Sequence, residues 1–234
     1  MAEEEKIREH AKHALQALTD KTKKWKDRIK DFIWEVFIIL VAVNITIWFH
    51  NWSDKRHEKR DMALYLNTIK LELEDNKKMF EETVIQLQPS VRYANYLRTH
   101  DKKTLNADTI KFYAQYYFTA NTIRIKTNAF DMFKTSGNMR LVDDKELLLS
   151  IWEIYAKLAD IEQAFNSFMQ LKLDNMIKES QLYSLYDIAS LSDEEILKNV
   201  PLYTFYAHIS APYAQPQLCE NGSAFINEML LKFK

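Results

Sequence analysis

One long run of apolar residues dominates the hydropathy pattern of this chain. Residues 32–49, FIWEVFIILVAVNITIWF, contain fifteen apolar side chains in eighteen positions and are flanked by clusters of lysine and arginine. At about 1.5 Å per residue, a helix of this length covers roughly 27 Å, close to the ~30 Å hydrocarbon core of a bilayer. Tryptophans mark both ends of the run, where aromatic rings favour the membrane interface: Trp34, Trp48 and Trp52. The pattern predicts one membrane-spanning helix.

Apolar residues then recur at three- and four-residue steps through residues 53–88, which contain neither proline nor glycine. This spacing predicts that the spanning helix continues as a stalk helix over 50–88 and ends at Pro89. Asn76 and Thr83 interrupt the apolar stripe. A polar residue at such a position would set the register of a coiled coil, although a single buried asparagine is more often incidental.

The pattern of residues 89–234 predicts a bundle of helices. Short helices are expected over 90–99, 107–119 and 121–135, and a long one runs from Asp143 or Asp144 to about residue 180. The residues expected to cap the short helices are Asn106 or Asp108, and Asn121.

The last 45 residues carry weaker helical signals. A short helix is expected where Ser192 precedes Asp-Glu-Glu, and a last helix is expected over about 223–233. Between them lies a tyrosine-rich stretch, expected to be irregular because it contains Pro201, Pro212 and Pro216.

Gly137 is one of only two glycines, and it follows Ser136 at the end of the predicted 121–135 helix. A glycine there is typical of a left-handed residue that ends a helix, so Ser136 and Gly137 are predicted to form a structural turn. The other glycine, Gly222, falls in a stretch that we interpret as a loose connection.

Composition agrees with an all-α protein, because two glycines and four prolines in 234 residues leave little turn chemistry for sheets. The 32 basic and 33 acidic residues nearly cancel, so no overall field favours a nucleic-acid partner. A single cysteine, Cys219, allows no internal disulfide and leaves the redox compartment open.

The residues flanking the span indicate its orientation. Six lysines or arginines lie in residues 17–31 and four in 50–64, which favours a cytoplasmic N-terminus. No small-residue cleavage site follows the span, so it is expected to be an uncleaved signal anchor. In a bacterium this arrangement means the inner membrane, with residues 50–234 periplasmic. Residues 1–31 form an amphipathic segment that suits either a surface helix or binding to anionic headgroups.

Polar residues within the span are costly in lipid and mark a predicted contact surface. Glu35 lies about one turn from the basic end, where it could reach the interface or pair with Arg28 or Lys30. Helical geometry places Glu35 on one stripe with Ile39, Ala42 and Thr46, whereas Asn44 lies almost opposite. Two polar faces on one helix favour an interface formed by several identical helices.

These features resemble a family of uncharacterised, single-pass, membrane-anchored bacterial proteins known only as a domain of unknown function. The resemblance covers about residues 30–180, and the positions that carry it are Glu35, Asn51, Trp52, Ala129, Phe130, Ser136, Gly137, Leu141 and Leu147. The span of this chain departs from the family pattern because it contains no glycine. No activity is known for the family, so the resemblance implies an architecture and no function.

The sequence offers little for catalysis. Glycines occur only at 137 and 222, so phosphate-binding loops, dinucleotide fingerprints and nucleophile elbows are excluded. Cys219 has no histidine nearby, and His10 and His13 come without the carboxylate or HExxH pattern of a metal site. We therefore expect no catalytic residue, cofactor or metal. Aromatic clusters around Tyr116 and Tyr206 suit either a groove or, more often, a helical core.

The expected function is that of a non-enzymatic, membrane-anchored assembly or scaffold protein that forms a homo-oligomer in the lipid bilayer and could contact another membrane protein. Three alternatives stay open. A pore subunit would place Asn44 or Glu35 around a conduit. A sensor would bind a small ligand in its bundle, although such receptors usually have a second span. A hydrolase without a recognisable motif ranks last.

Overall fold

The structure, a computed structural model, describes residues 8–13, 25–117, 119, 121–180, 188 and 190–233. Every regular element in these ranges is helical, which confirms the predicted all-α class. The chain forms two compact units, Met1–Asp61 and Met62–Lys234. Of the predicted amphipathic segment, residues 8–13 are helical, whereas Ala14 and Leu18 of its apolar stripe lie outside the described residues.

The first unit contains the start of helix α2, which runs Trp25–Thr99. From Ile29 onward this helix is long and apolar enough to cross a membrane, and none of its most apolar window is buried within the chain. Large apolar side chains such as Ile33, Phe37 and Ile45 are more than half exposed. The predicted spanning segment is therefore a helix whose apolar surface the described chain leaves uncovered.

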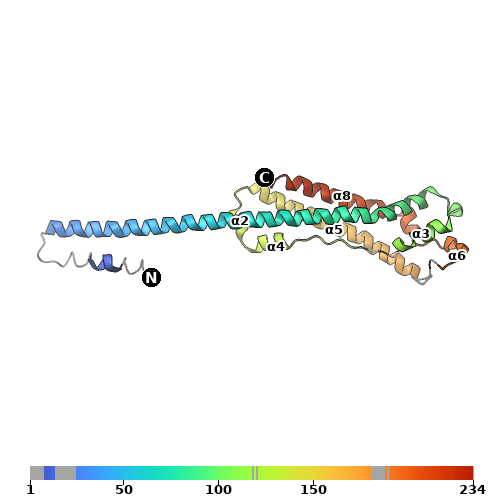
Figure 1. Cartoon of the computed structure of the whole chain (residues 1–234), viewed down its shortest axis with the longest axis horizontal. Coiled ribbons are helices and arrows are strands. Elements are labelled where there is room, and N and C mark those ends of the chain that lie inside the picture. The colour runs from blue at the N-terminus through green and yellow to red at the C-terminus, as the bar shows by residue number, and fades with distance from the viewer. Residues whose placement is uncertain are drawn as a thin grey trace. The chain divides into compact units, whose positions relative to one another are not determined.

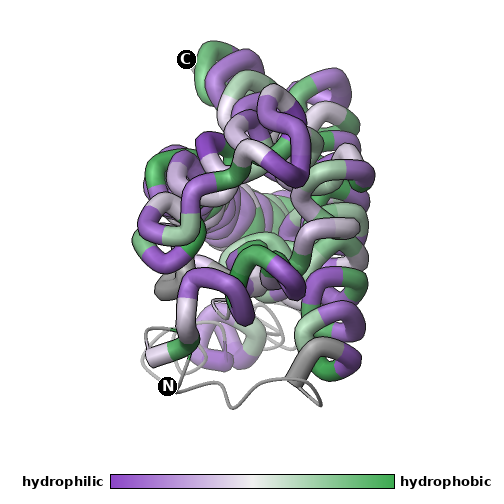
Figure 2. The backbone as a smooth tube through the Cα atoms, turned by 90° about the vertical axis from the view of Figure 1, so that its right-hand side faces the viewer, coloured by the Kyte–Doolittle hydropathy of each residue, from purple (hydrophilic) through white to green (hydrophobic). Residues whose placement is uncertain are grey.

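Three long helices form the second unit: α2 from Met62 onward, α5 (Lys145–Ser180) and α8 (Ala211–Leu230). Figure 1 shows α5 and α8 running alongside this part of α2. The shorter elements are η1 (Lys102–Thr104), α3 (Ala107–Tyr117), α4 (Asn128–Thr135), η2 (Asn138–Leu141), α6 (Asp193–Lys198) and α7 (Tyr203–His208). Hydrophilic and hydrophobic residues alternate along these helices, as Figure 2 shows, so each helix can turn one face inward.

Two hydrophobic clusters hold this unit together. The first joins α2, α4, α5 and α8 through side chains such as Leu73, Phe133 and Phe165. The second joins the C-terminal end of α2 with α3, α6 and α7 through Leu97, Ile110 and other residues. The apolar stripe of α2 that begins at Met62 is buried, so residues 62–88 belong to the second compact unit. The sequence pattern assigned these residues to a stalk.

Helix α2 does not end at Pro89, contrary to the prediction. It continues to Thr99 with Pro89 inside it. A proline in a helix removes one backbone hydrogen bond and costs about 3 kcal/mol. The next two turns bury Tyr93, Ala94 and Leu97 in the second cluster, and the burial of these side chains offsets that cost.

The predicted helix over 121–135 is wrong in its first half. Residues 121–127 are not helical, and Figure 1 shows this stretch, here called the extended segment, drawn out before α4, which begins only at Asn128. In this stretch Ile123 and Ile125 are buried while Arg124 and Lys126 are exposed. Alternation with a period of two, carried by β-branched residues, is the signal of an extended strand.

The C-terminal region is more regular than expected. The predicted irregular stretch contains α7 and most of α8, which starts at Ala211 rather than near residue 223. Pro212 lies in the first turn of α8, where a missing N–H costs nothing, and Pro216 lies inside the helix. Gly222 is buried in the middle of α8, so its assignment to a loose connection is wrong.

Several helix starts follow the prediction. Ser192 and Glu195 form a capping box at the start of α6. Asn106 accepts a hydrogen bond from the backbone N–H of Thr109 at 2.9 Å, and Asp144 accepts one from Leu147 at 2.9 Å. Asn121 caps no helix, because the residues after it are extended.

Candidate functional site

The predicted interfacial tryptophans are exposed on the apolar helix. Trp34 and Trp48 are 63 % and 67 % exposed, and Trp52 is 46 % exposed. The ring of Trp34 stacks on Phe37 with 5.7 Å between centroids, and the guanidinium of Arg56 lies 5.0 Å from the ring of Trp52. Rings with this exposure are available to a membrane interface at each end of the apolar run.

The polar groups of the span bond largely within their own helix. Asn44 donates from Nδ2 to the carbonyl of Leu40 at 2.7 Å, and Thr46 donates from its hydroxyl to Ala42 at 2.9 Å. The Oδ1 atom of Asn44 has no hydrogen-bond partner in the part of the chain that the structure describes. Ile39 is half-buried, whereas Ala42, Asn44 and Thr46 are exposed. The predicted stripe is thus present on one helix, and its members Ala42 and Thr46, like Asn44, are exposed and bond only within that helix among the described residues.

Glu35 pairs with His10, whose Nδ1 lies 3.2 Å from its Oε1. The sequence suggested Arg28 or Lys30 as the partner, and no pattern in it connected Glu35 with the histidines. The side chain of Arg28 is not among those described. Across the described ranges no group of three potential metal ligands occurs.

The turn at Ser136 and Gly137 has the predicted conformation. Gly137 has φ +73°, in the left-handed region, directly after α4. Ser136 donates its hydroxyl to the carbonyl of Phe133 at 2.9 Å and accepts from the N–H of Asn138 at 3.2 Å. This turn therefore ends α4 and directs the chain into η2.

A buried carboxylate joins three elements in the middle of the bundle. Glu72 of α2 is 8 % exposed and accepts hydrogen bonds from the backbone N–H of Ala129 at 2.7 Å and of Phe130 at 3.3 Å, at the start of α4. The hydroxyl of Tyr155 donates to the same carboxylate at 2.5 Å, and burial raises the pKa of Tyr155 far above its usual value. The N-terminus of α4, which is the positive end of the helix dipole, also stabilises the negative charge of this carboxylate.

Side chains of α2 and α5 bind the backbone of the extended segment 121–127. Asn166 exchanges two hydrogen bonds with Ile123, donating to its carbonyl at 3.0 Å and accepting from its N–H at 3.1 Å. Asn76 makes the same pair of bonds with Lys126, at 2.9 and 2.8 Å. Glu162 accepts from the N–H of Ile125 at 3.0 Å. Asn76 thus holds the backbone of the extended segment in place. The helical spacing did not indicate this role.

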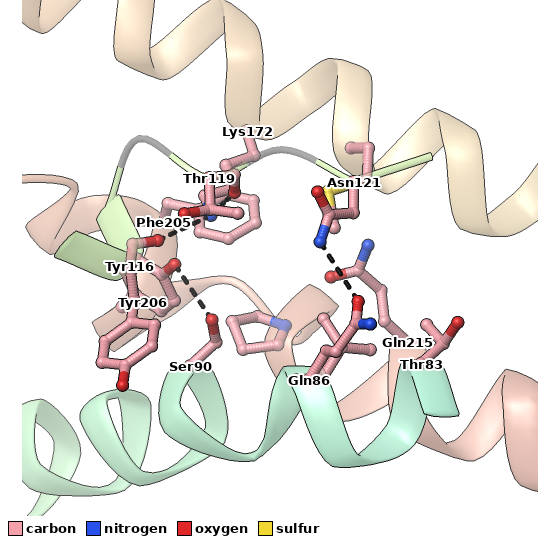
Figure 3. Close-up of a pocket in the computed structure, with 13 residues that line it drawn as sticks. Thr83, Gln86, Ser90, Tyr116, Thr119, Asn121, Lys172, Phe205, Tyr206 and Gln215 are labelled. Carbon is pink, nitrogen blue, oxygen red and sulfur yellow. Dashed lines mark hydrogen bonds between the residues drawn. The ribbon is translucent and has the colours of Figure 1, made fainter. Parts of the chain in front are cut away.

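A small cavity with both polar and apolar lining residues lies where the two hydrophobic clusters meet. It has a volume of about 40 Å³ and is lined on one side by Leu87 and Met169 and on the other by Phe205 and Tyr206. Figure 3 shows the side chains that surround it, contributed by α2, α3, α5, α7 and α8 and by Thr119 and Asn121. On its solvent side Asn121 donates to Gln86 at 3.3 Å.

Lys172 of α5 places its ammonium group beside this cavity. The residue is only 3 % exposed, and Nζ donates to the carbonyl of Tyr116 at 3.1 Å and to that of Thr119. Nζ also lies 5.8 Å from the ring centroid of Tyr206. Burial lowers the pKa of Lys172 to about 8. No acidic group of the described chain lies within salt-bridge distance, so this buried cation has no counter-charge among the described residues.

Gln215 of α8 lines the same cavity and is 3 % exposed. Its Nε2 atom is buried and has no hydrogen-bond partner among the described residues. Ser90 receives a long hydrogen bond of 3.5 Å from the hydroxyl of Tyr206. Four polar residues of the cavity come from four different helices: Ser90, Lys172, Tyr206 and Gln215. The apolar periodicity of the sequence therefore does not indicate that they lie together.

The remaining candidates from the sequence are structural. Cys219 is fully buried in the first cluster, and burial raises the pKa of its thiol to about 12. Of the aromatic clusters, Phe205 and Tyr206 are core residues, whereas Phe112 is 64 % exposed. Tyr116, Phe205 and Tyr206 line the small cavity described above.

Comparison of this chain with protein-family models, with curated proteins and with solved structures finds no match. The resemblance to a family of membrane-anchored bacterial proteins therefore stays a prediction.

Proposed function

We propose that this protein is a non-enzymatic assembly module that crosses the inner membrane of a bacterium once and self-associates through its span. The bundle of residues 62–234 would lie in the periplasm and the N-terminus in the cytoplasm. The observation that carries the proposal is Asn44, an exposed amide in the middle of an apolar helix that has no cover within the described chain.

The physical reason is the cost of an unpaired polar group in hydrocarbon. The Nδ2 group of Asn44 donates to Leu40, but its Oδ1 atom accepts from no described residue. A partner helix of the same sequence can donate its second amide hydrogen to this oxygen, and small residues such as Ala42 let two helices approach closely. Other identical helices are therefore the simplest occupants of this surface.

The chemistry of the bundle supports a role without catalysis. Its buried carboxylate, Glu72, binds two backbone N–H groups and a tyrosine hydroxyl, and its one cysteine is buried with a raised pKa. Groups held in this way stabilise the fold, because the carboxylate is occupied by three hydrogen bonds and the thiol is buried with its pKa raised.

Native mass spectrometry of the full chain in mild detergent and in lipid nanodiscs tests the proposal. We expect a discrete homo-oligomer that Asn44→Leu weakens by roughly 1 kcal/mol per lost hydrogen bond, or about fivefold in each dissociation constant. Ile45→Leu, an exposed apolar neighbour, is the control and should leave the oligomer unchanged. A monomeric wild-type protein in both media would contradict self-association.

Orientation needs a separate experiment. Lys78 has a side chain that is 76 % exposed, so Lys78→Cys in a Cys219→Ala background places one accessible thiol on the bundle. We expect a membrane-impermeant thiol reagent to label it in intact spheroplasts. Labelling that requires lysis would show that the bundle is cytoplasmic.

A pore subunit is the alternative that also uses Asn44. It predicts ion flux through purified protein in liposomes, which a scaffold does not produce. If such flux occurs and Asn44→Leu abolishes it, the span conducts ions and the protein is a pore subunit, not a scaffold.

A further inference from the structure

Donor groups at the cavity beside Lys172 are left without acceptors in the described part of the chain. Two of the three ammonium hydrogens of Lys172 bond to the carbonyls of Tyr116 and Thr119, which leaves one for another acceptor. The Nε2 group of Gln215 donates to no described atom, and the hydroxyl hydrogen of Ser90 is likewise not used within the described chain. The cavity is thus built to receive an acceptor.

The charge balance points to an anion. Buried cations in proteins are normally paired, because an ammonium group loses several kcal/mol of hydration when it leaves water. Lys172 is 3 % exposed, and its partners among the described residues are two neutral carbonyls and the face of Tyr206. A ligand with a negative charge would supply the missing partner.

Size and lining select the kind of anion. A cavity of about 40 Å³ is roughly three times the ~10–15 Å³ that one water molecule needs on the same measure, so it has room for a ligand of only a few heavy atoms. Leu87, Met169 and Phe205 form apolar walls, which suit a methyl or methine group better than a fully hydrated inorganic ion. We infer that the cavity binds a short carboxylate of the size of formate or acetate, with one oxygen on Lys172 and the rest of the ligand directed toward Gln215.

The solvent side of the cavity provides an entrance. Asn121 and Gln86 are both exposed and joined by one long hydrogen bond of 3.3 Å. A hydrogen bond between neutral side chains contributes only about 0.5–1.5 kcal/mol, so this exposed one opens readily. This inference does not depend on self-association of the span, since every residue it uses belongs to the bundle.

Thermal unfolding of the full chain in nanodiscs, with sodium formate or sodium acetate against sodium chloride at equal ionic strength, tests the inference. A ligand that binds only the folded state stabilises it by RT ln(1 + [L]/Kd), so the melting temperature should rise and its dependence on concentration should follow a single-site curve. Line broadening of ¹³C-labelled acetate in NMR spectra gives the affinity directly. A rise that is linear in salt concentration, or equal in chloride, would overturn the proposal.

Variants and pH identify the site. Gln215→Leu and Lys172→Met should each weaken acetate binding by tenfold or more, whereas Gln217→Leu and Lys178→Met, exposed on the same two helices, should not. In the wild type, raising the pH from 7 to 9 removes most of the charge of Lys172, so binding should weaken about tenfold. The pH dependence is measured on the wild-type protein, so it tests the role of Lys172 even if Lys172→Met does not fold. Binding that is unchanged by pH and by Gln215→Leu would refute it.

Discussion

Gly222 of α8 lies against the ring of Phe80 of α2 so closely that a β-carbon on residue 222 would be 2.6 Å from Cε2 of that ring. Phe80 is fully buried in the first hydrophobic cluster, so its ring has little room to move away. The absence of a side chain at residue 222 therefore lets α8 approach α2. This contact belongs to the packing of two helices that are far apart in the chain.

Gly222→Val should destabilise the bundle by about 3 kcal/mol, because the side chain collides with Phe80 and overpacks the core. Gly137→Val should cost about 1–2 kcal/mol, since Gly137 has φ +73° but open space around it. Urea unfolding followed by circular dichroism measures both values. The order is the reverse of the one that the sequence suggests. A Gly222→Val protein as stable as the wild type would show that α2 and α8 do not pack in this way.

Tyr155→Phe should cost roughly 1.5–3 kcal/mol, because it removes a hydrogen bond to the buried carboxylate of Glu72 without changing the volume of the core. Phe130, which stacks on Tyr155 with 4.2 Å between ring centroids, should keep its packing. The same unfolding experiment measures the loss. Glu74→Gln, on an exposed face of α2, is the control and should change the free energy of unfolding by less than about 0.5 kcal/mol.

Asn166→Ala and Asn76→Ala should release different parts of the extended segment. The first removes both hydrogen bonds to Ile123, and the second removes both hydrogen bonds to Lys126. We expect amide hydrogen exchange at the affected residue to accelerate by roughly tenfold to a hundredfold, which corresponds to about 1–3 kcal/mol of local stability. Asn175→Ala, whose side chain bonds within α5, should accelerate neither amide. Equal acceleration of both amides in each variant would indicate global destabilisation instead.

Lys172 should make stability depend on pH in the alkaline range. Its pKa is about 8 in the folded protein against 10.5 in the unfolded chain, so between these values the unfolded state binds more protons. Stability should therefore rise with pH relative to Lys172→Met, by roughly 3 kcal/mol from pH 8 to pH 10.5, since 10.5 − 8 is 2.5 pKa units. Below pH 8 the lysine is charged in both states and the cost of its burial is fully present.

Unfolding curves of both proteins in buffers without carboxylates measure this difference. Lys178→Met, which removes an exposed lysine of the same helix, should parallel the wild type at every pH. Parallel curves for Lys172→Met as well would mean that water reaches the ammonium group in the folded protein.

The local elements of this fold depend on short-range signals. The capping box at Ser192 and the left-handed Gly137 each depend on residues within one turn, so their chemistry is visible in a short window of sequence. The helices over 107–117 and 145–180 repeat their apolar positions often enough to be predicted. The extended segment at 121–127 carries a short alternating pattern, but next to a helix of similar composition that pattern is easily missed.

The buried polar residues depend on contacts between segments that are distant in the sequence. Glu72, Asn166, Lys172 and Gln215 are polar residues in amphipathic helices, and such residues usually face solvent. Nothing near them in the sequence indicates burial, because their partners lie far away in the chain or are absent from its described part. Only the approach of α2, α5 and α8 to one another determines which polar positions become buried and what they bind.

The sequence by itself determined the all-α class, an apolar helix near the N-terminus long enough to cross a membrane, and the turn at Gly137. Each depends on composition or on neighbours along the chain, and a helix satisfies its own backbone hydrogen bonds locally. The tertiary structure decided that α2 continues through Pro89, that residues 121–127 stay extended, and that Lys172 and Gln215 face one cavity. These outcomes depend on which surfaces become buried together, and the free energy of burial is shared among segments distant in sequence.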